Sequence, residues 1–109
     1  MKKSKHDAAL DGILNRPNLI GLDDVALIGK EVRLYNARGE LCAEPDILAY
    51  DRREGWVIGE YKNTHDKAVR AKKQLYRALT HLKGHGIIDE AMMLYINKQM
   101  RVISYDKKR

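Results

Sequence analysis

The sequence predicts a single α/β domain over residues 1–109, ordered as a helix, a three-stranded antiparallel meander, a second helix and two further strands in a mixed central sheet. Three observations predict it. The chain has 109 residues, 44% of them apolar, which is enough for one hydrophobic core. Short apolar runs of strand length alternate with turns in the middle and at the end of the chain. Two stretches with helically spaced apolar residues complete the pattern.

The opening elements are a helix and a strand. Residues 6–15 carry apolar side chains at helical spacing, and Pro17 follows closely enough to end the helix. Residues 19–28 are ambiguous, because they could form a second short helix or an irregular segment ending at Gly29. Residues 31–36 alternate polar and apolar side chains, which predicts the first strand of the meander.

A β-hairpin over residues 45–62 is the clearest feature of the sequence. Two apolar runs, residues 45–50 and 56–62, are separated by the polar turn Asp51–Gly55. Runs of this length around a turn are typical of paired antiparallel strands. The meander therefore consists of strands at about 31–36, 40–50 and 56–62.

A long amphipathic helix is expected after the hairpin, from an N-cap at Thr64 to Lys83. Its buried face is predicted to consist of Ala68, Ala71, Leu75, Ala78, Leu79 and Leu82. A second stripe carries the polar side chains Lys67, Arg70, Gln74 and Arg77. This stripe is either a contact surface or an ordinary solvated face. Strands over residues 91–96 and 100–105 follow the helix.

Composition narrows the functional classes. The formal net charge of +6 favours a polyanionic partner, with nucleic acid first. No apolar stretch is long enough to span a membrane, and no apolar signal segment follows the basic N-terminus, so we expect a cytoplasmic protein. Cys42 is the only cysteine, which excludes an intrachain disulfide and a cysteine-based zinc site.

Charged side chains are concentrated at the open end of the predicted hairpin. Asp46 and Glu60 lie at the strand ends away from the turn, so pairing of the strands brings them close together. Lys62 projects from the same side as Glu60, because side chains alternate along a strand. Burying these groups is costly without compensation. A bound divalent cation would compensate them; the alternative is an ion pair on a solvated sheet face.

The motif Pro45-Asp46, thirteen intervening residues and then Glu60-Tyr61-Lys62 resembles the signature of the PD-(D/E)xK nuclease superfamily. The restriction-endonuclease-like core of that superfamily has the element order predicted above. The resemblance implies a DNA endonuclease that hydrolyses phosphodiester bonds and needs Mg²⁺, for which Mn²⁺ can substitute. The small size resembles the Holliday-junction resolvases of archaea and their viruses, which implies structure-selective cleavage by a homodimer. Met92–Tyr95 with the final hairpin could then supply the dimer surface.

The resemblance also implies roles for individual residues. Asp46 and Glu60 would bind the metal with the backbone carbonyl of Tyr61, and Lys62 would act on the attacking water. Gln74 would be a further catalytic residue, facing that water. Nucleic-acid contacts would come from the basic side chains of the second helix, Lys67, Arg70, Lys73 and Arg77.

The sequence departs from the family in its opening helix, where a metal-binding Glu is common. This helix contains no Glu, and His6, Asp7 and Asp11 are the candidates instead. Asp7 and Asp11 are four residues apart and share a helix face. Glu44 is a further candidate, since it has the strand parity of Asp46.

Two other functions are compatible with the pattern. One is an exonuclease or restriction-type nuclease of the same fold. The other is a non-catalytic nucleic-acid-binding module, against which the combination of Asp46, Glu60 and Lys62 argues, because binding alone requires none of the three.

Overall fold

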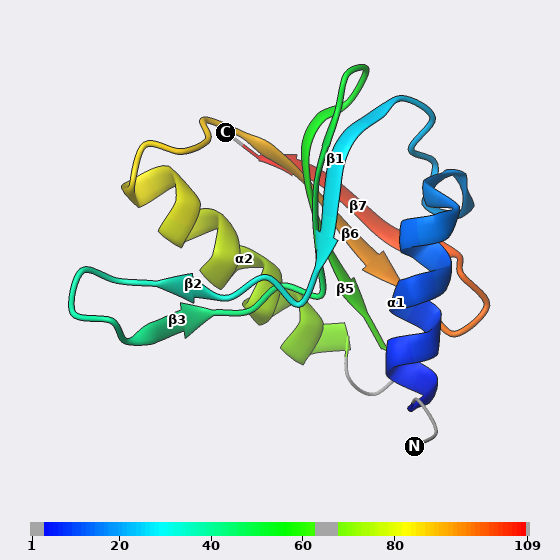
Figure 1. Ribbon diagram of the computed structural model, residues 1–109, viewed down its shortest axis with the longest axis horizontal. Helices are drawn as coiled ribbons and strands as arrows, with labels where there is room; N and C mark the ends of the chain where they lie inside the picture. Colours follow the sequence, from blue (N-terminus) through cyan, green and yellow to red (C-terminus); the bar gives the residue numbers. More distant parts are fainter. Residues whose placement is uncertain (1–3, 63–67, 109) are drawn as a thin grey trace.

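The computed structural model describes residues 4–62 and 68–108, in which two helices flank a mixed sheet (Figure 1). The helices are α1 (Lys5–Asn15) and α2 (Ala68–Gly84), and a short 3-10 helix, η1, spans Pro17–Ile20. The strands are β1 (Val25–Lys30), β2 (Leu34–Tyr35), β3 (Leu41–Ala43), β4 (Ile47–Asp51), β5 (Gly55–Tyr61), β6 (Ala91–Ile96) and β7 (Val102–Lys108). Among the described residues, no helix is long and apolar enough to cross a membrane.

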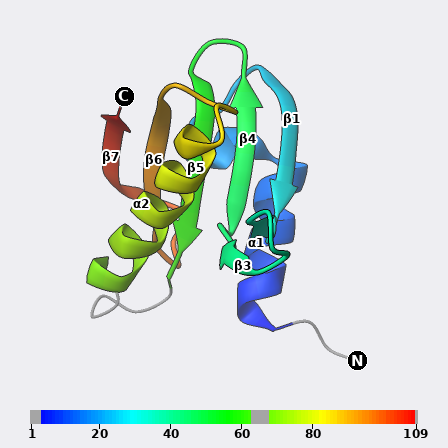
Figure 2. The ribbon, with the colours of Figure 1, turned by 90° about the vertical axis from the view of Figure 1, so that its left-hand side faces the viewer.

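The sheet has five strands in the order β1-β4-β5-β6-β7. β1, β4 and β5 pair antiparallel, β6 joins β5 in parallel after α2, and β7 pairs antiparallel with β6. Helix α2 lies across one face of the sheet and α1 covers the other (Figure 2). The strand predicted at 91–96 is confirmed, whereas the last strand begins at Val102 rather than residue 100 and continues to Lys108.

Both predicted helices are present. The hydroxyl of Ser4 accepts a hydrogen bond from the Asp7 backbone N–H (3.0 Å), which caps the first turn of α1. The expected inward face of α2 is confirmed where its side chains are described: Ala71, Leu75, Ala78, Leu79 and Leu82 are all buried. Thr64, the expected cap of α2, lies outside the described residues.

The first strand of the meander was predicted wrongly. It is β1, over 25–30, and not the segment 31–36. β1 lies at the edge of the sheet and its register shifts between Val25 and Leu27, so it lacks the regular alternation that marks a half-buried strand. Leu27 is apolar but half-exposed, so its position does not follow the expected alternation of buried apolar and exposed polar residues.

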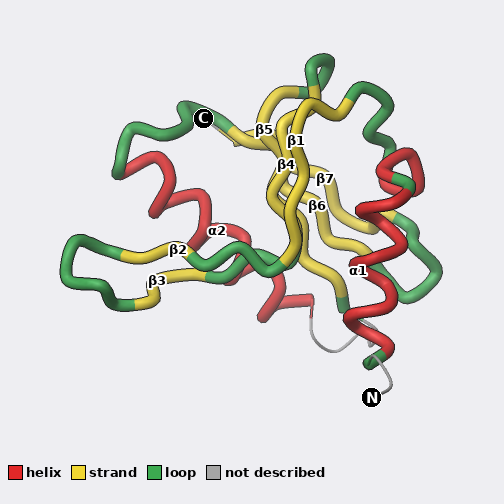
Figure 3. Tube along the Cα trace, in the orientation of Figure 1, coloured by secondary structure: helices red, strands yellow, loops and turns green. Residues whose placement is uncertain are grey.

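The predicted strand over residues 40–50 is divided into β3 and β4. Pro45 lies at the break, where it has no N–H to donate to a strand ladder. The carbonyls of Pro45 and Asp46 instead accept hydrogen bonds from the Val32 and Glu31 N–H groups (3.2 and 2.8 Å). Beyond these bonds the chain leaves the main sheet, and β2 and β3 form a separate hairpin that contacts α2 through β3 (Figure 3).

Hydrophobic side chains fill both faces of the sheet. Alternate residues of β6 pack toward α1 and toward α2, as Leu94 and Met93 do. Met92, Met93, Leu94 and Tyr95 are only 1–5% exposed within the single chain. The proposed use of these side chains as a dimer surface is therefore wrong, because they already belong to the core.

Asp51 fixes the closed end of the central hairpin. One of its carboxylate oxygens accepts the N–H groups of Arg53 and Glu54 (2.9 and 3.0 Å), and the other accepts that of Asp24 (2.9 Å). Burial by itself raises the pKa of Asp51, but the three N–H donors outweigh it and leave the pKa below its ordinary value. The side chain thus joins the turn to the segment before β1.

We predict that Asp51→Ala lowers the free energy of unfolding by about 3 kcal/mol, because it removes the acceptor of three part-buried backbone N–H groups. Asp51→Asn keeps one acceptor oxygen and should cost about half as much. A depressed pKa stabilises the fold above the ordinary value of 3.8, and this contribution disappears as the pH falls through the folded-state pKa. Urea unfolding at neutral and at acidic pH checks both effects; a loss below about 1 kcal/mol for Asp51→Ala at neutral pH would contradict the assignment.

Candidate functional site

The structure brings Asp46 and Glu60 together, as the hairpin pattern predicts. Asp46 directly precedes β4, Glu60 is the penultimate residue of β5, and the pairing of Ile47 with Gly59 places the two acids opposite each other. Asp46 is 9% exposed and Glu60 is 1% exposed. Two acidic side chains are therefore buried side by side at the open end of the hairpin.

Reciprocal hydrogen bonds hold this pair. The Asp46 backbone N–H donates to Oε1 of Glu60 (3.2 Å), and the Tyr61 N–H donates to Oδ2 of Asp46 (2.9 Å). Each carboxylate is thus bound to the backbone of the opposite strand. Neither side chain can swing away without breaking a hydrogen bond between β4 and β5.

The proximity of the acids changes the protonation of Glu60. Burial raises the pKa of Glu60 to about 9, together with the charge of Asp46 and a side-chain hydrogen bond between the two carboxyl groups. The Asp46 N–H and the charge of Lys62 act in the opposite direction and do not cancel the effect. Without a further cation, Glu60 therefore retains a proton at neutral pH.

Helix α1 adds His6 to the pair. Nε2 of His6 lies 3.2 Å from Oδ1 of Asp46, and the imidazole packs edge-to-face on the ring of Tyr61, with centroids 5.7 Å apart. His6 is one of the three opening-helix candidates, and its spacing in the sequence did not distinguish it from the other two. The fold does so, because it places the His6 side chain against Asp46.

Of the two other candidates on α1, Asp11 contacts a lysine and Asp7 acts on the same lysine through its charge. Oδ1 of Asp11 contacts Nζ of Lys30 on β1 at 2.7 Å. This hydrogen bond raises the pKa of Lys30, and the charge of Asp7 raises it further. Asp7 and Asp11 therefore act together on the Lys30 ammonium group.

Gln74 and Glu44 both line a small cavity between α2 and β3. The cavity measures about 230 Å³ and also includes Arg77. Oε1 of Gln74 is buried and has no hydrogen-bond partner among the described residues. Oε1 of Glu44 lies 3.9 Å from Nε of Arg33, a distance typical of a loose ion pair. The contact of Gln74 with β3 and its unpaired oxygen are features that the sequence pattern did not indicate.

Lys62 and the basic face of α2 lie on either side of the undescribed segment 63–67. Lys62 is half-buried, and its backbone N–H donates to the Ile96 carbonyl on β6 (2.9 Å). Arg70, Lys73 and Arg77 are exposed on α2, whereas Lys67 lies outside the described residues.

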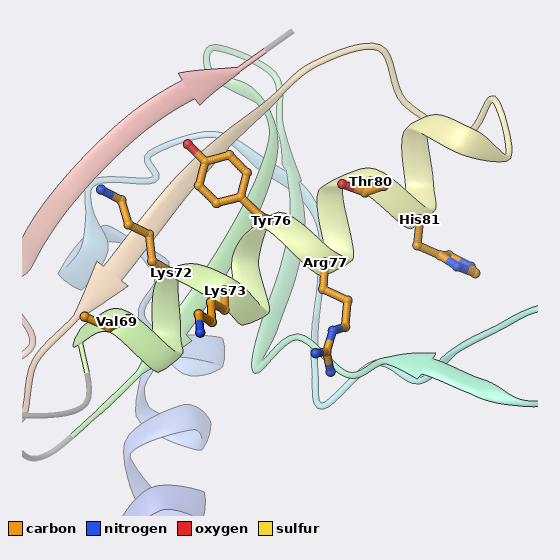
Figure 4. A pocket seen from close by; sticks show the side chains of 7 residues that line it. All are labelled: Val69, Lys72, Lys73, Tyr76, Arg77, Thr80 and His81. Atoms are coloured by element: carbon orange, nitrogen blue, oxygen red, sulfur yellow. The ribbon is translucent and has the colours of Figure 1, made fainter.

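The outer face of α2 forms an open groove of about 700 Å³ (Figure 4). The groove contains Lys73 and Arg77, which the sequence pattern singled out, together with Lys72 and Tyr76, which it did not. Their i, i+4 spacing from Lys72 to Tyr76 could have indicated a shared face. Basic and aromatic side chains in this arrangement are suited to a polyanion that carries planar groups.

The donor chemistry of the acidic pair fits a hard divalent cation. Mg²⁺ prefers carboxylate and carbonyl oxygens and retains several waters, so two carboxylates suffice to bind it. Asp46 and Glu60 would supply the carboxylates, and a cation in place of the proton on Glu60 would offset the repulsion between the two ionised groups. In the described part of the chain, no three His, Cys, Asp or Glu side chains are grouped as a metal site.

We predict that the metal-free protein loses stability as the pH rises from 4.5 to about 9. In this window the folded state retains a proton on Glu60 that the unfolded chain releases, so stability is full below 4.5 and falls toward the raised pKa. The slope is at most about 1.4 kcal/mol per pH unit. Thermal unfolding in EDTA should show this decline for the wild type and a flatter profile for Glu60→Gln.

The exposed Glu40 offers the matched control, since Glu40→Gln makes the same chemical change on the β2–β3 turn. Its profile should follow that of the wild type. Parallel profiles for wild type and Glu60→Gln would contradict the raised pKa.

Comparison of the chain with protein-family models, curated proteins and solved structures finds no match. The function must therefore be inferred from the chemistry of these residues.

Proposed function

We propose that the protein is a divalent-metal-dependent DNA endonuclease that hydrolyses phosphodiester bonds and selects its substrate by DNA structure. One observation carries this proposal: two buried carboxylates, Asp46 and Glu60, are held together at neighbouring strand ends, with Lys62 two residues after Glu60. A module that only bound nucleic acid would gain nothing from burying a pair of acids that repel each other and the phosphates.

The order of the elements supports the same proposal. Helix α1 is followed by the antiparallel strands β1, β4 and β5, then by α2 and the parallel strand β6. This order agrees with the restriction-endonuclease-like core that the sequence motif implies, with the β2–β3 hairpin inserted between the first two strands of the meander. Under this proposal, Asp46 opens the second core strand and Glu60 lies near the end of the third.

In the proposed site, Asp46 and Glu60 would hold Mg²⁺ or Mn²⁺ together with the Tyr61 carbonyl. The cation would lower the pKa of a bound water and offset the charge that develops at phosphorus. Lys62 would orient or deprotonate the attacking water beside the scissile phosphate. His6 hydrogen-bonds Oδ1 of Asp46 and fixes the direction of that carboxylate. Gln74 stays a candidate catalytic residue, located in the adjacent cavity.

DNA would be held mainly through its backbone. Arg70, Lys73 and Arg77 present positive charge along α2, in agreement with the net charge of +6. Contacts of this kind position a nucleic acid without reading its sequence, which favours recognition of DNA shape. Cleavage of two strands would require a homodimer, whose surface lies elsewhere than the buried core strand β6.

An exonuclease or a restriction-type enzyme with the same site is the second candidate. The acidic pair is equally suited to these reactions, because they share the hydrolytic step. The distinction lies in which DNA is cut.

We predict cleavage of DNA in Mg²⁺ or Mn²⁺, with a four-way junction preferred over plasmid, linear duplex and single strands. Asp46→Asn, Glu60→Gln and Lys62→Ala should each lower the cleavage rate at least about 100-fold, because each removes a group required in the hydrolytic step. Gel assays on the four substrates measure this directly.

Asp23→Asn and Arg53→Ala are the matched controls. They change the same kinds of charge at the opposite end of the hairpin, where Asp23 and Arg53 lie 3.9 Å apart at the surface. Both should cut at the wild-type rate. A wild type that cuts none of the substrates, or site variants that cut as fast as the controls, would show that the proposal is wrong.

We further predict that His6→Gln slows cleavage about 10- to 100-fold without abolishing it, because the imidazole acts through Asp46. The apparent Mg²⁺ affinity should weaken as well, since Oδ1 of Asp46 loses its partner. His85→Gln, at an exposed histidine beyond α2, is the control. If His6→Gln leaves both the cleavage rate and its Mg²⁺ dependence unchanged, His6 has no role in the site.

A further inference from the structure

A cavity between β3 and α2 includes Glu44, a near neighbour of Asp46 in the chain. It measures about 230 Å³ and is lined by Leu41, Cys42, Ala43, Glu44, Gln74 and Arg77. Glu44 precedes Asp46 by two residues, a separation of at most about 7 Å along extended chain. A ligand group in this cavity would therefore lie next to the proposed scissile phosphate.

Gln74 leaves a polar atom unpaired in this region. Its Oε1 is buried without a hydrogen-bond partner among the described residues, although buried acceptors are normally paired. A carboxamide can turn about its last side-chain bond, so Gln74 can present an acceptor or a donor to the cavity that it lines. Where it lies, the buried oxygen gains no hydrogen bond from the described residues, whereas after such a turn it would accept one from a ligand N–H group in the cavity.

The other polar side chains restrict the chemistry of that ligand. Glu44 and the Gln74 oxygen are acceptors, which disfavour a phosphate because phosphate oxygens are also acceptors. Arg77 carries a positive charge on the same cavity, which disfavours a metal ion or an ammonium group. A neutral planar group with both N–H donors and acceptor atoms matches all three side chains.

The size of the cavity points to a single such group. Pockets for drug-sized ligands span roughly 300–1,000 Å³, and this cavity is smaller. A nucleobase with an exocyclic amine offers N–H donors to Glu44 and Gln74 and a ring nitrogen or carbonyl to Arg77.

We propose that the cavity holds one unpaired nucleobase that carries an exocyclic amine, from the nucleotide beside the scissile phosphate. The proposal rests on the proposed function for its partner, DNA. The base must be unpaired, because pairing occupies the amine. Unpaired bases occur at branch points and ends, so the cavity would contribute to selection by structure.

The test compares two pyrimidines, of which cytosine has the exocyclic amine and thymine has none. Fluorescence anisotropy in EDTA measures binding of labelled oligo-deoxycytidine and oligo-deoxythymidine of equal length, without cleavage. We expect the wild type to bind oligo-deoxycytidine about 5- to 10-fold more tightly. Gln74→Leu and Glu44→Ala should each bring this ratio close to one.

Glu40→Ala provides the matched control. Glu40 and Glu44 each lie near an arginine, at 4.0 Å from Arg38 and 3.9 Å from Arg33, so both substitutions remove one negative charge and one loose ion pair. Glu40→Ala also removes the hydrogen bond that Glu40 accepts from the Asn36 side chain (3.0 Å). Glu40 is outside the cavity, and its variant should keep the wild-type ratio even if loss of the charge strengthens binding to both oligonucleotides. Gln74→Leu also removes a buried unpaired acceptor, so its thermal midpoint should equal or exceed that of the wild type.

Equal binding of the two oligonucleotides by the wild type would overturn the proposal. So would a ratio that survives both cavity substitutions, or a protein that binds neither oligonucleotide. These results are distinct from failure of the nuclease proposal. If the protein prefers oligo-deoxycytidine but cuts no DNA, the base site is supported and the nuclease proposal is wrong. If it cuts DNA but binds the two oligonucleotides equally, only the base site is wrong.

Discussion

Mutual repulsion between two buried carboxylates is the constraint on which the candidate site depends. Asp46 and Glu60 cannot separate, because each accepts a backbone N–H from the opposite strand. The carbonyls of Pro45 and Asp46 are in turn bound by the segment after β1, which fixes the start of β4. The fold thus imposes a pairing that is unfavourable for the two acids alone, and a proton on Glu60 or a cation from outside must relieve it.

The two ends of β4 show how the surroundings decide the state of a buried acid. Asp51 receives three backbone N–H groups, and its pKa falls below the ordinary value despite complete burial. Glu60 receives one N–H and faces Asp46, and its pKa rises to about 9. Backbone N–H groups therefore stabilise the charged form of Asp51 at the turn, whereas at the open end a proton or a cation is needed beside Glu60. That contrast separates a structural acid from one suited to bind a metal.

The sequence predicted the parts of the fold whose patterns are local. The central hairpin, α1, the inward face of α2 and β6 follow from apolar spacing and turn residues. β1 was missed because an edge strand with a register shift lacks regular alternation, and the division at Pro45 depends on hydrogen bonds from residues 31 and 32. Spacing could not choose among His6, Asp7 and Asp11 either, because the choice depends on how α1 lies against the sheet, where Asp11 contacts Lys30 on a strand that was itself missed. The unpaired oxygen of Gln74 depends on packing between α2 and a hairpin that leaves the sheet.

Metal binding by the acidic pair can be tested with a crystal soaked in Mn²⁺ and measured at the manganese absorption edge. We expect an anomalous peak between the carboxylates of Asp46 and Glu60, within coordination distance of both, and its loss in a crystal of Asp46→Asn. One peak or two would also give the number of metal ions. Absence of a peak at this pair, with the ion bound only elsewhere, for example at His81 and His85, whose ring centroids are 4.4 Å apart, would show that the pair is not a metal site.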